Sequence, residues 1–278
     1  YYDCFGEGTF TGKGLIRTER YYKECTGRIP DERVLSHDII EGSFLKTAYC
    51  GDIEFNDNTP PTSKGWFNRL HRWYRGDIQN YFFLADETLS LLTKFKLSDN
   101  IRRVLTDFNA FSALFFSLFS DSLLPVAVVI LSVIMPYLLA LIPGAIKGLS
   151  FSNRREFYSP VISLTRNLLS QAFLDIVYLG KNTVVGLDAL IRSAVRIITG
   201  KNLLRWQTSS IFDRISAIGY SDMILPTLSG VVLFGFSVYY GSISVAIISL
   251  FIMSCIPVSI WCDRVTPVFE RPIKEKDR

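Results

Sequence analysis

The segment VLSHDIIEG, residues 34–42, contains two carboxylates next to a histidine. Either Asp38 or Glu41 has the group that a general base needs when a sugar hydroxyl loses its proton as it attacks. His37, directly before Asp38, would tune or orient that carboxylate. The same residues also fit an ordinary helix start, because Ser36 or Asp38 would cap a helix that begins here. The segment alone leaves both interpretations open.

A second segment, RLHRWYRGD, combines three arginines, a histidine and a tryptophan: Arg69, Arg72, Arg75, His71 and Trp73. Arginine is suited to a two-point grip on a diphosphate. The flat apolar face of tryptophan is suited to stacking under a sugar ring. The alternative is a basic, aromatic collar at a membrane surface, where arginine and tryptophan anchor routinely.

A third segment, FGEGTFTGKG at residues 5–14, has four glycines in ten positions. Glycine allows the backbone to approach a ligand closely. The alternative is a set of ordinary turns without a ligand.

The composition of the chain changes after residue 103, from mixed and polar to largely apolar. The 278-residue chain is 49% hydrophobic, and neither lysine nor arginine occurs in residues 104–146 or 215–263. Each run is about twice the length that one bilayer crossing needs, so each predicts a hairpin of two transmembrane helices. The alternative is a set of buried core helices in a soluble protein. The four predicted spans are 105–120, 123–143, 223–240 and 244–262.

Residues 147–214 carry ten lysines and arginines, whereas the two hairpin tips carry none. The positive-inside rule therefore predicts that this segment and both termini are cytoplasmic, on a multi-pass protein of the cytoplasmic (inner) membrane. Within the segment, NTVVGLDALIRSAVRIITGKNLLRW has apolar residues at helical spacing. Either an interfacial helix on anionic lipid or a helix packed on a neighbouring domain fits that pattern.

Composition excludes several classes. Thirty Lys+Arg against 26 Asp+Glu give a net charge of +4, which is not the concentrated basic stripe of a nucleic-acid binder. The five cysteines form no C-x-x-C pair, so neither a disulfide framework nor a zinc knuckle is predicted. With two histidines, a histidine-rich metal site is excluded.

Taken in order, these segments resemble a known family. VLSHDIIEG, then HRWYRGD about 35 residues later, then apolar helices, resembles the C-terminal half of processive membrane glycosyltransferases of the cellulose-synthase type. With FGEGTFTGKG and NLLRWQTSS included, the order is more similar to the glycosyltransferase part of cyclic β-1,2-glucan synthases. The resemblance extends over nearly the whole chain.

The resemblance implies an inverting transfer from UDP-glucose to a growing β-1,2-glucan, with Asp38 as catalytic base. Arg72 and Trp73 match the R-W pair associated with the diphosphate and the acceptor sugar. A divalent cation, Mg²⁺ or Mn²⁺, is expected at a D-x-D motif upstream, and no residue of this chain is expected to bind it. The further residues expected to line the substrate site are Gly6, Gly8, Thr11, Gly12, Lys13, His37, Glu41, Arg69 and His71.

The implied fold is α/β, the second half of a GT-A type domain in residues 1–100, with late strands within residues 1–60. The all-α membrane region follows as hairpins 104–146 and 215–263 around interfacial helices in 147–214. Residues 264–278 would lead to a downstream phosphorylase-like domain. Because no D-x-D precedes Asp38, we expect a fragment that lacks the donor-binding half and is inactive alone.

The chain departs from the family pattern where the glutamine of Q-x-x-R-W falls on Arg69, and where a glutamine before the histidine is replaced by Leu70. Acceptor contacts there are therefore in question. Two alternatives stay open: a related polysaccharide synthase with a different linkage, and a membrane scaffold without chemistry.

Overall fold

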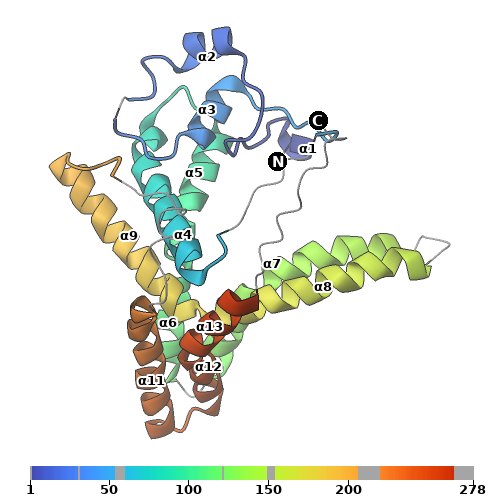
Figure 1. Ribbon diagram of the computed structural model, residues 1–278, viewed down its shortest axis with the longest axis vertical. Helices are drawn as coiled ribbons and strands as arrows, with labels where there is room; N and C mark the ends of the chain where they lie inside the picture. The colour runs from blue at the N-terminus through green and yellow to red at the C-terminus, as the bar shows by residue number, and fades with distance from the viewer. Residues whose placement is uncertain are drawn as a thin grey trace. The chain divides into compact units, whose positions relative to one another are not determined.

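The structure is a computed structural model that describes residues 2–30, 32–53, 60–120, 122–148, 154–205 and 220–265 (Figure 1). The described residues fall into two compact units. The first unit contains residues 2–106, 185–205 and 262–265, and the second contains residues 107–184 and 220–261.

The predicted α/β fold is wrong for the described residues, because every regular element in them is helical. Where strands were expected, the chain forms α1 (Tyr2–Phe5), α2 (Thr18–Cys25) and α3 (Asp38–Leu45). A strand needs a neighbouring strand to satisfy its backbone groups, whereas a helix satisfies its own. No such neighbour exists among the described residues. Asp52, within the segment where late strands were expected, lies in an exposed turn, and Ile53 follows it.

Three further helical elements complete the N-terminal part of the first unit. They are α4 (Ser63–Gln79), the 3-10 helix η1 (Asn80–Ala85) and α5 (Leu91–Val104). The side chain of Thr62 accepts a hydrogen bond from Gly65 N at the start of α4, and Ser90 does the same for Thr93 N at α5. These caps satisfy backbone donors that the first turn of a helix leaves unpaired. The turns of α9 (Leu179–Thr199) from Val185 onward also belong to this unit.

The core of the first unit holds α3 in place. Its buried apolar members are Cys25, Val34, Ile40, Phe44, Phe83, Leu89 and Leu97. Helix α4 passes close to the loop before α3, since a Cβ atom placed on Gly76 would lie 2.6 Å from the Ser36 Cβ. Asn80 Nδ2 also donates a hydrogen bond of 2.9 Å to Ser36 O. The start of α3 is therefore held directly by α4.

The second unit is built from apolar helices. They are α6 (Thr106–Ser117), α7 (Leu124–Gly148), α8 (Arg154–Val177), η2 (Ser221–Met223), α11 (Ile224–Tyr239), α12 (Ile243–Met253) and the first turns of α13 (Cys255–Val265). Helices α11 and α12 lie side by side as a hairpin (Figure 1). Gly241 turns the chain between them at a φ of 72°, and Ser242 N donates back to Ser237 O. This is the glycine-based helix end that a left-handed residue permits.

The prediction of four transmembrane helices is also corrected. Among the described residues, one helix, Ser221–Tyr239, is long and apolar enough to cross a bilayer. A second crossing is possible only if Ile243–Met253 and Cys255–Arg264, bent by 42°, act as one span. The helices begin and end near the predicted breaks, but the 12 residues of α6 extend only about 18 Å, short of the roughly 30 Å hydrocarbon core. Helix α6 is therefore too short for the first predicted span.

We expect Gly76→Ala to destabilise the protein, because the added Cβ overlaps Ser36. Overpacking of this kind costs about 1–3 kcal/mol. The midpoint of thermal unfolding of the detergent-solubilised chain measures the effect. Gly235→Ala is the matched helical control, since its Cβ would meet no described heavy atom within 4 Å. An unchanged midpoint for Gly76→Ala would contradict the close contact.

Candidate functional site

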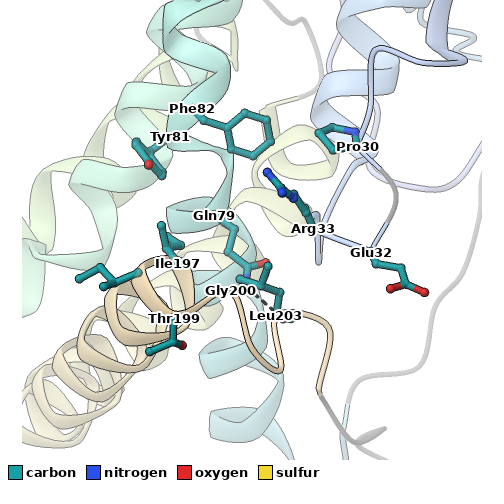
Figure 2. A pocket seen from close by; sticks show the side chains of 11 residues that line it. Pro30, Glu32, Arg33, Gln79, Tyr81, Phe82, Ile197, Thr199, Gly200 and Leu203 are labelled. Atoms are coloured by element: carbon teal, nitrogen blue, oxygen red, sulfur yellow. Dashed lines mark hydrogen bonds between the residues drawn. The ribbon is translucent and has the colours of Figure 1, made fainter.

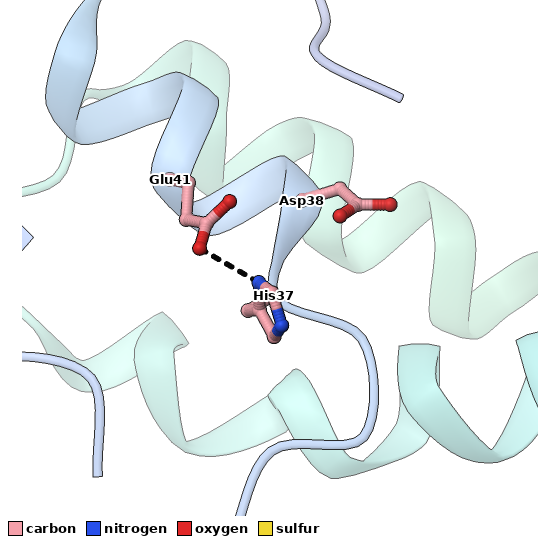
Figure 3. Close-up of side chains that lie close together, drawn as sticks. All are labelled: His37, Asp38 and Glu41. Atoms are coloured by element: carbon pink, nitrogen blue, oxygen red, sulfur yellow. Dashed lines mark ion pairs between the residues drawn. The ribbon is translucent and has the colours of Figure 1, made fainter. Parts of the chain in front are cut away.

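The two carboxylates of VLSHDIIEG lie at the start of α3 and have different surroundings (Figure 3). Glu41 is one helical turn from His37, and its Oε1 lies 2.7 Å from His37 Nδ1. Asp38 points away from this pair in Figure 3 and is half-buried. No hydrogen bond or ion pair joins its carboxylate to another described residue. Of the two acids, Asp38 is therefore the one available to a ligand.

Glu41 is engaged with the protein itself. Its residue is only 5% exposed, and the Tyr21 hydroxyl donates a second hydrogen bond of 3.1 Å to Oε1. Burial, followed by the hydrogen bond to the Glu41 carboxylate, raises the pKa of Tyr21, so the hydroxyl stays a donor at neutral pH. Since Glu41 accepts from His37 Nδ1, the Nε2 atom of His37 is the one left to face outward. Glu41 thus orients His37.

The glycine-rich segment lies against Asp38. Gly12 has a φ of 79°, and a Cβ placed on it would lie 3.0 Å from Asp38 Oδ2. The segment is held there through Gly8, whose N–H donates to Thr47 O at 2.8 Å and whose carbonyl accepts from Lys96 Nζ at 2.9 Å. A side chain at Gly12 would occupy the space in front of the carboxylate, so glycine is required for both its conformation and its size.

The remaining predicted site residues of the glycine-rich segment are exposed. Thr11 and Lys13 flank Gly12 and are exposed, as is Gly6. Buried Glu7 ties the segment to α5 and to the end of α3, with Lys96 Nζ and Lys46 Nζ each 3.4 Å from its carboxylate. The sequence interpretation did not single out Glu7 as an anchor.

The R-W pair lies on α4, one turn before the contact with the α3 loop. Residues four apart share a helix face, so Arg72 lies on the face that contacts Ser36 at Gly76. Trp73 is 40% exposed, which leaves much of its ring open to a ligand. Its ring meets Trp66 edge-on at 6.0 Å, and the Arg69 guanidinium lies 5.8 Å from its centroid. Arg69 thus supports Trp73.

Two residues of the same segment have structural partners. His71, which was predicted to bind substrate, has its Nε2 atom 2.9 Å from Asp188 Oδ2 on α9. Arg75 is buried and donates to the carbonyls of Leu203 and Arg205 at 3.1 and 3.0 Å. Burial, together with the nearby cations of α9, lowers the pKa of Arg75 to about 10.

Arg75 therefore anchors the beginning of the LLRWQTS segment, with help from Gln79, whose amide nitrogen donates to Leu203 O at 3.1 Å. Trp206 and the residues that follow it lie outside the described residues.

A pocket of about 650 Å³ opens on the far end of α4 (Figure 2). None of its lining residues was predicted from the sequence as a site residue. The segment NYFF, at the start of η1, was the available signal, because it offers aromatic rings beside polar groups. The lining residues are Pro30, Glu32, Arg33, Gln79, Tyr81, Phe82, Ile197, Ile198, Thr199, Gly200 and Leu203.

His37, Asp38 and Glu41 together offer the donor atoms of a possible metal site. One atom from each lies within 4.8 Å of the others. However, Glu41 Oε1 lies 2.7 Å from His37 Nδ1 as an ion pair, and it also accepts a hydrogen bond from the Tyr21 hydroxyl. The group therefore fits an oriented histidine beside a separate carboxylate better than three metal ligands.

The chain is related to glucan synthases, which are glycosyltransferases. The particular relative is the cyclic beta-(1,2)-glucan synthase NdvB of Rhizobium meliloti strain 1021. It is 33% identical over 217 residues, which are 76% of this chain and 8% of the relative. The relationship predicted from the motifs is therefore confirmed, and the chain spans a small part of that relative's length. No family model matches the chain.

His71 predicts a loss of folding stability on acidification. Burial lowers the pKa of His71, although Asp188 partly opposes this. The unfolded chain then binds the proton first as the pH falls below about 6.5, so His71 reduces folding stability on acidification. We expect His71→Asn to lessen the drop in the thermal unfolding midpoint between pH 7.5 and pH 5.5.

His37→Asn is the control, since the side chain of His37 is half exposed. An unchanged pH dependence in the His71 variant would show that His71 is not the group responsible.

Proposed function

We propose that this chain is the acceptor-side part of an inverting glucosyltransferase that builds β-1,2-glucan from UDP-glucose. The observation that carries the proposal is the accessible carboxylate of Asp38 beside Gly12, next to a Glu41 that is already engaged by His37 and Tyr21. The relationship to a cyclic beta-(1,2)-glucan synthase supports the choice of reaction.

Asp38 acts as the general base in this proposal. A hydroxyl of the acceptor sugar gives its proton to the carboxylate while its oxygen attacks C1 of the donor glucose. The bond from C1 to the diphosphate oxygen breaks on the opposite face, so the configuration at C1 inverts and UDP leaves. His37, held by Glu41, presents its Nε2 beside this carboxylate and contacts the acceptor.

The leaving diphosphate and the acceptor ring are assigned to α4. Arg72 places a guanidinium charge where the diphosphate accumulates negative charge. Trp73 stacks on the acceptor ring, and Arg69 and Trp66 hold its orientation. A bound divalent cation would neutralise further diphosphate charge, and we assign no residue of this chain to it, because His37 and Glu41 pair with each other.

The setting of this reaction is proposed to be the cytoplasmic face of the inner membrane. The relationship to a glucan synthase and the apolar helix Ser221–Tyr239 support membrane association. The cationic segment 147–214 supports a cytoplasmic position for it and for both termini. UDP-glucose, the growing glucan and the lipid bilayer are the proposed partners, with a donor-binding half and a phosphorylase-like domain contributed by flanking sequence. No role in nucleic-acid binding is proposed.

We expect Asp38→Asn to reduce glucosyl transfer by on the order of 10²–10⁴-fold, because the amide cannot accept the proton. The protein is expressed from its complete open reading frame, and membranes are assayed for glucose incorporated from UDP-glucose. UDP-glucose affinity should be nearly unchanged. Linkage analysis of the product separates β-1,2 from other linkages.

Asp52→Asn is the control, since Asp52 is an exposed acid in a turn. Turnover of Asp38→Asn at the level of the unmodified protein would remove Asp38 from the role of base. Absence of any incorporation by the unmodified protein would favour a scaffold without chemistry.

We expect Trp73→Ala to slow glucan elongation more than hydrolysis of the donor, because only elongation needs the acceptor ring. Loss of one stacking contact costs about 1–3 kcal/mol, which is about fivefold to 150-fold in rate. Trp66→Ala, on the same helix, should have a smaller effect. Equal losses of elongation and hydrolysis in the Trp73 variant would assign Trp73 to the structure alone.

A further inference from the structure

The pocket of Figure 2, which we call the α4-end pocket, is a cavity that the candidate site does not use. Its described lining residues all belong to the first unit, and neither Asp38 nor Trp73 is among them. Its volume of about 650 Å³ lies within the roughly 300–1,000 Å³ that small-ligand pockets occupy. Gln79, which lines it, lies about 9 Å beyond Trp73 along the axis of α4. The α4-end pocket therefore has room for a ligand of its own, close to the candidate site.

Hydrogen bonds hold the walls of the α4-end pocket together. Gln79 is 2% exposed, and its amide nitrogen donates to Leu203 O at 3.1 Å (Figure 2). Its amide oxygen accepts from Leu35 N, also at 3.1 Å. The end of α4 is thereby joined to the turn after α9 and to the loop before α3. Because these bonds form without a ligand, the pocket is preformed, and binding needs little reordering of the chain.

One wall of the α4-end pocket offers aromatic surface in a fixed position. The Phe82 ring stacks on the buried Phe83 ring at 4.3 Å, and Tyr81 meets Phe82 edge-on at 6.3 Å. Tyr81 is nevertheless 48% exposed, and its hydroxyl makes no hydrogen bond to another described residue. An exposed ring that its neighbours hold in place is suited to stacking on the apolar C–H face of a sugar.

The charges at the α4-end pocket balance. Arg33 and Glu32 are the charged side chains among its described lining residues, one of each sign. The Arg33 side chain extends between Pro30 and Phe82 (Figure 2). A guanidinium donates hydrogen bonds and a carboxylate accepts them, so the pair suits hydroxyl groups, which do both. A nucleotide or another anion would instead need an excess of positive charge.

We propose that the α4-end pocket binds a short stretch of a neutral oligosaccharide, with Tyr81 under a sugar ring and Arg33 and Glu32 on its hydroxyls. A sugar chain combines apolar C–H faces with many hydroxyls, and the aromatic wall and the balanced charges match both. The choice of β-1,2-linked glucose as this sugar rests on the proposed function, which makes the growing glucan the oligosaccharide nearest to the pocket. The pocket then holds part of the glucan away from its reacting end.

The test measures binding of a linear β-1,2-linked glucose oligosaccharide to the full chain in lipid nanodiscs by isothermal titration calorimetry. No UDP-glucose is added, so the result does not depend on transfer. All variants carry Trp73→Ala, which weakens the proposed acceptor position, and we expect binding to remain. Adding Tyr81→Ala should weaken the remaining binding about tenfold, as expected for loss of one stacking contact. Tyr22→Ala is the matched control, since Tyr22 is 71% exposed in the same unit and does not line the pocket.

Arg33→Met is a second variant, and loss of its charged hydrogen bonds should also weaken binding about tenfold. The thermal unfolding midpoints of the Tyr81 and Arg33 variants should match that of the chain with Trp73→Ala alone, because both side chains are exposed. Equal affinities in the Tyr81, Arg33 and Tyr22 variants would overturn the proposal, as would loss of all binding with Trp73→Ala alone. Displacement of the sugar by UDP, in a manner that needs Tyr81, would assign the pocket to an anion instead.

A β-1,4-linked glucose oligosaccharide separates this proposal from the proposed function. If it binds in place of the β-1,2-linked one and still needs Tyr81, the α4-end pocket is a sugar site and the proposed linkage is wrong.

Discussion

The close approach of α4 to the loop before α3, at Gly76, is the contact on which the candidate site depends. Because Gly76 has no side chain, the helix that carries Arg72 and Trp73 can pass against Ser36, two residues before Asp38. Asn80, the first residue of η1 directly after that helix, also holds the loop. The two segments that the motifs connect only by their order are thereby joined in space, and a larger residue at position 76 would separate them.

A second consequence of the fold is that two neighbouring carboxylates have different surroundings. Asp38 and Glu41 are three residues apart, and composition alone makes them equivalent candidates. Burial commits Glu41 to His37 and Tyr21, since a buried carboxylate needs hydrogen-bond donors. Asp38 at the first position of α3 remains available. An acid that orients a histidine beside a second, accessible acid is a combination suited to proton transfer.

The arginines also differ in their burial and in the groups that they contact. Arg75 is buried and binds the carbonyls of residues 203 and 205, so it acts on the protein's own backbone. Arg69 lies over Trp73, and Arg72 lies on the face that contacts the α3 loop. Position relative to the core, rather than residue type, separates the structural role of Arg75 from the proposed substrate role of Arg72.

Local patterns in the sequence determined the motifs, the relationship to glucan synthases and the places where the apolar helices begin and end, because these depend on residues close together in the chain. The tertiary structure decided what depends on distant contacts. It replaced the expected strands with helices, since strands need partners that the described residues lack. Among the described residues it leaves one helix, or two if a bent pair acts as one span, that is long and apolar enough to cross a bilayer. It also placed His71 Nε2 2.9 Å from Asp188 Oδ2, because pairing between distant residues arises only when separate segments pack together.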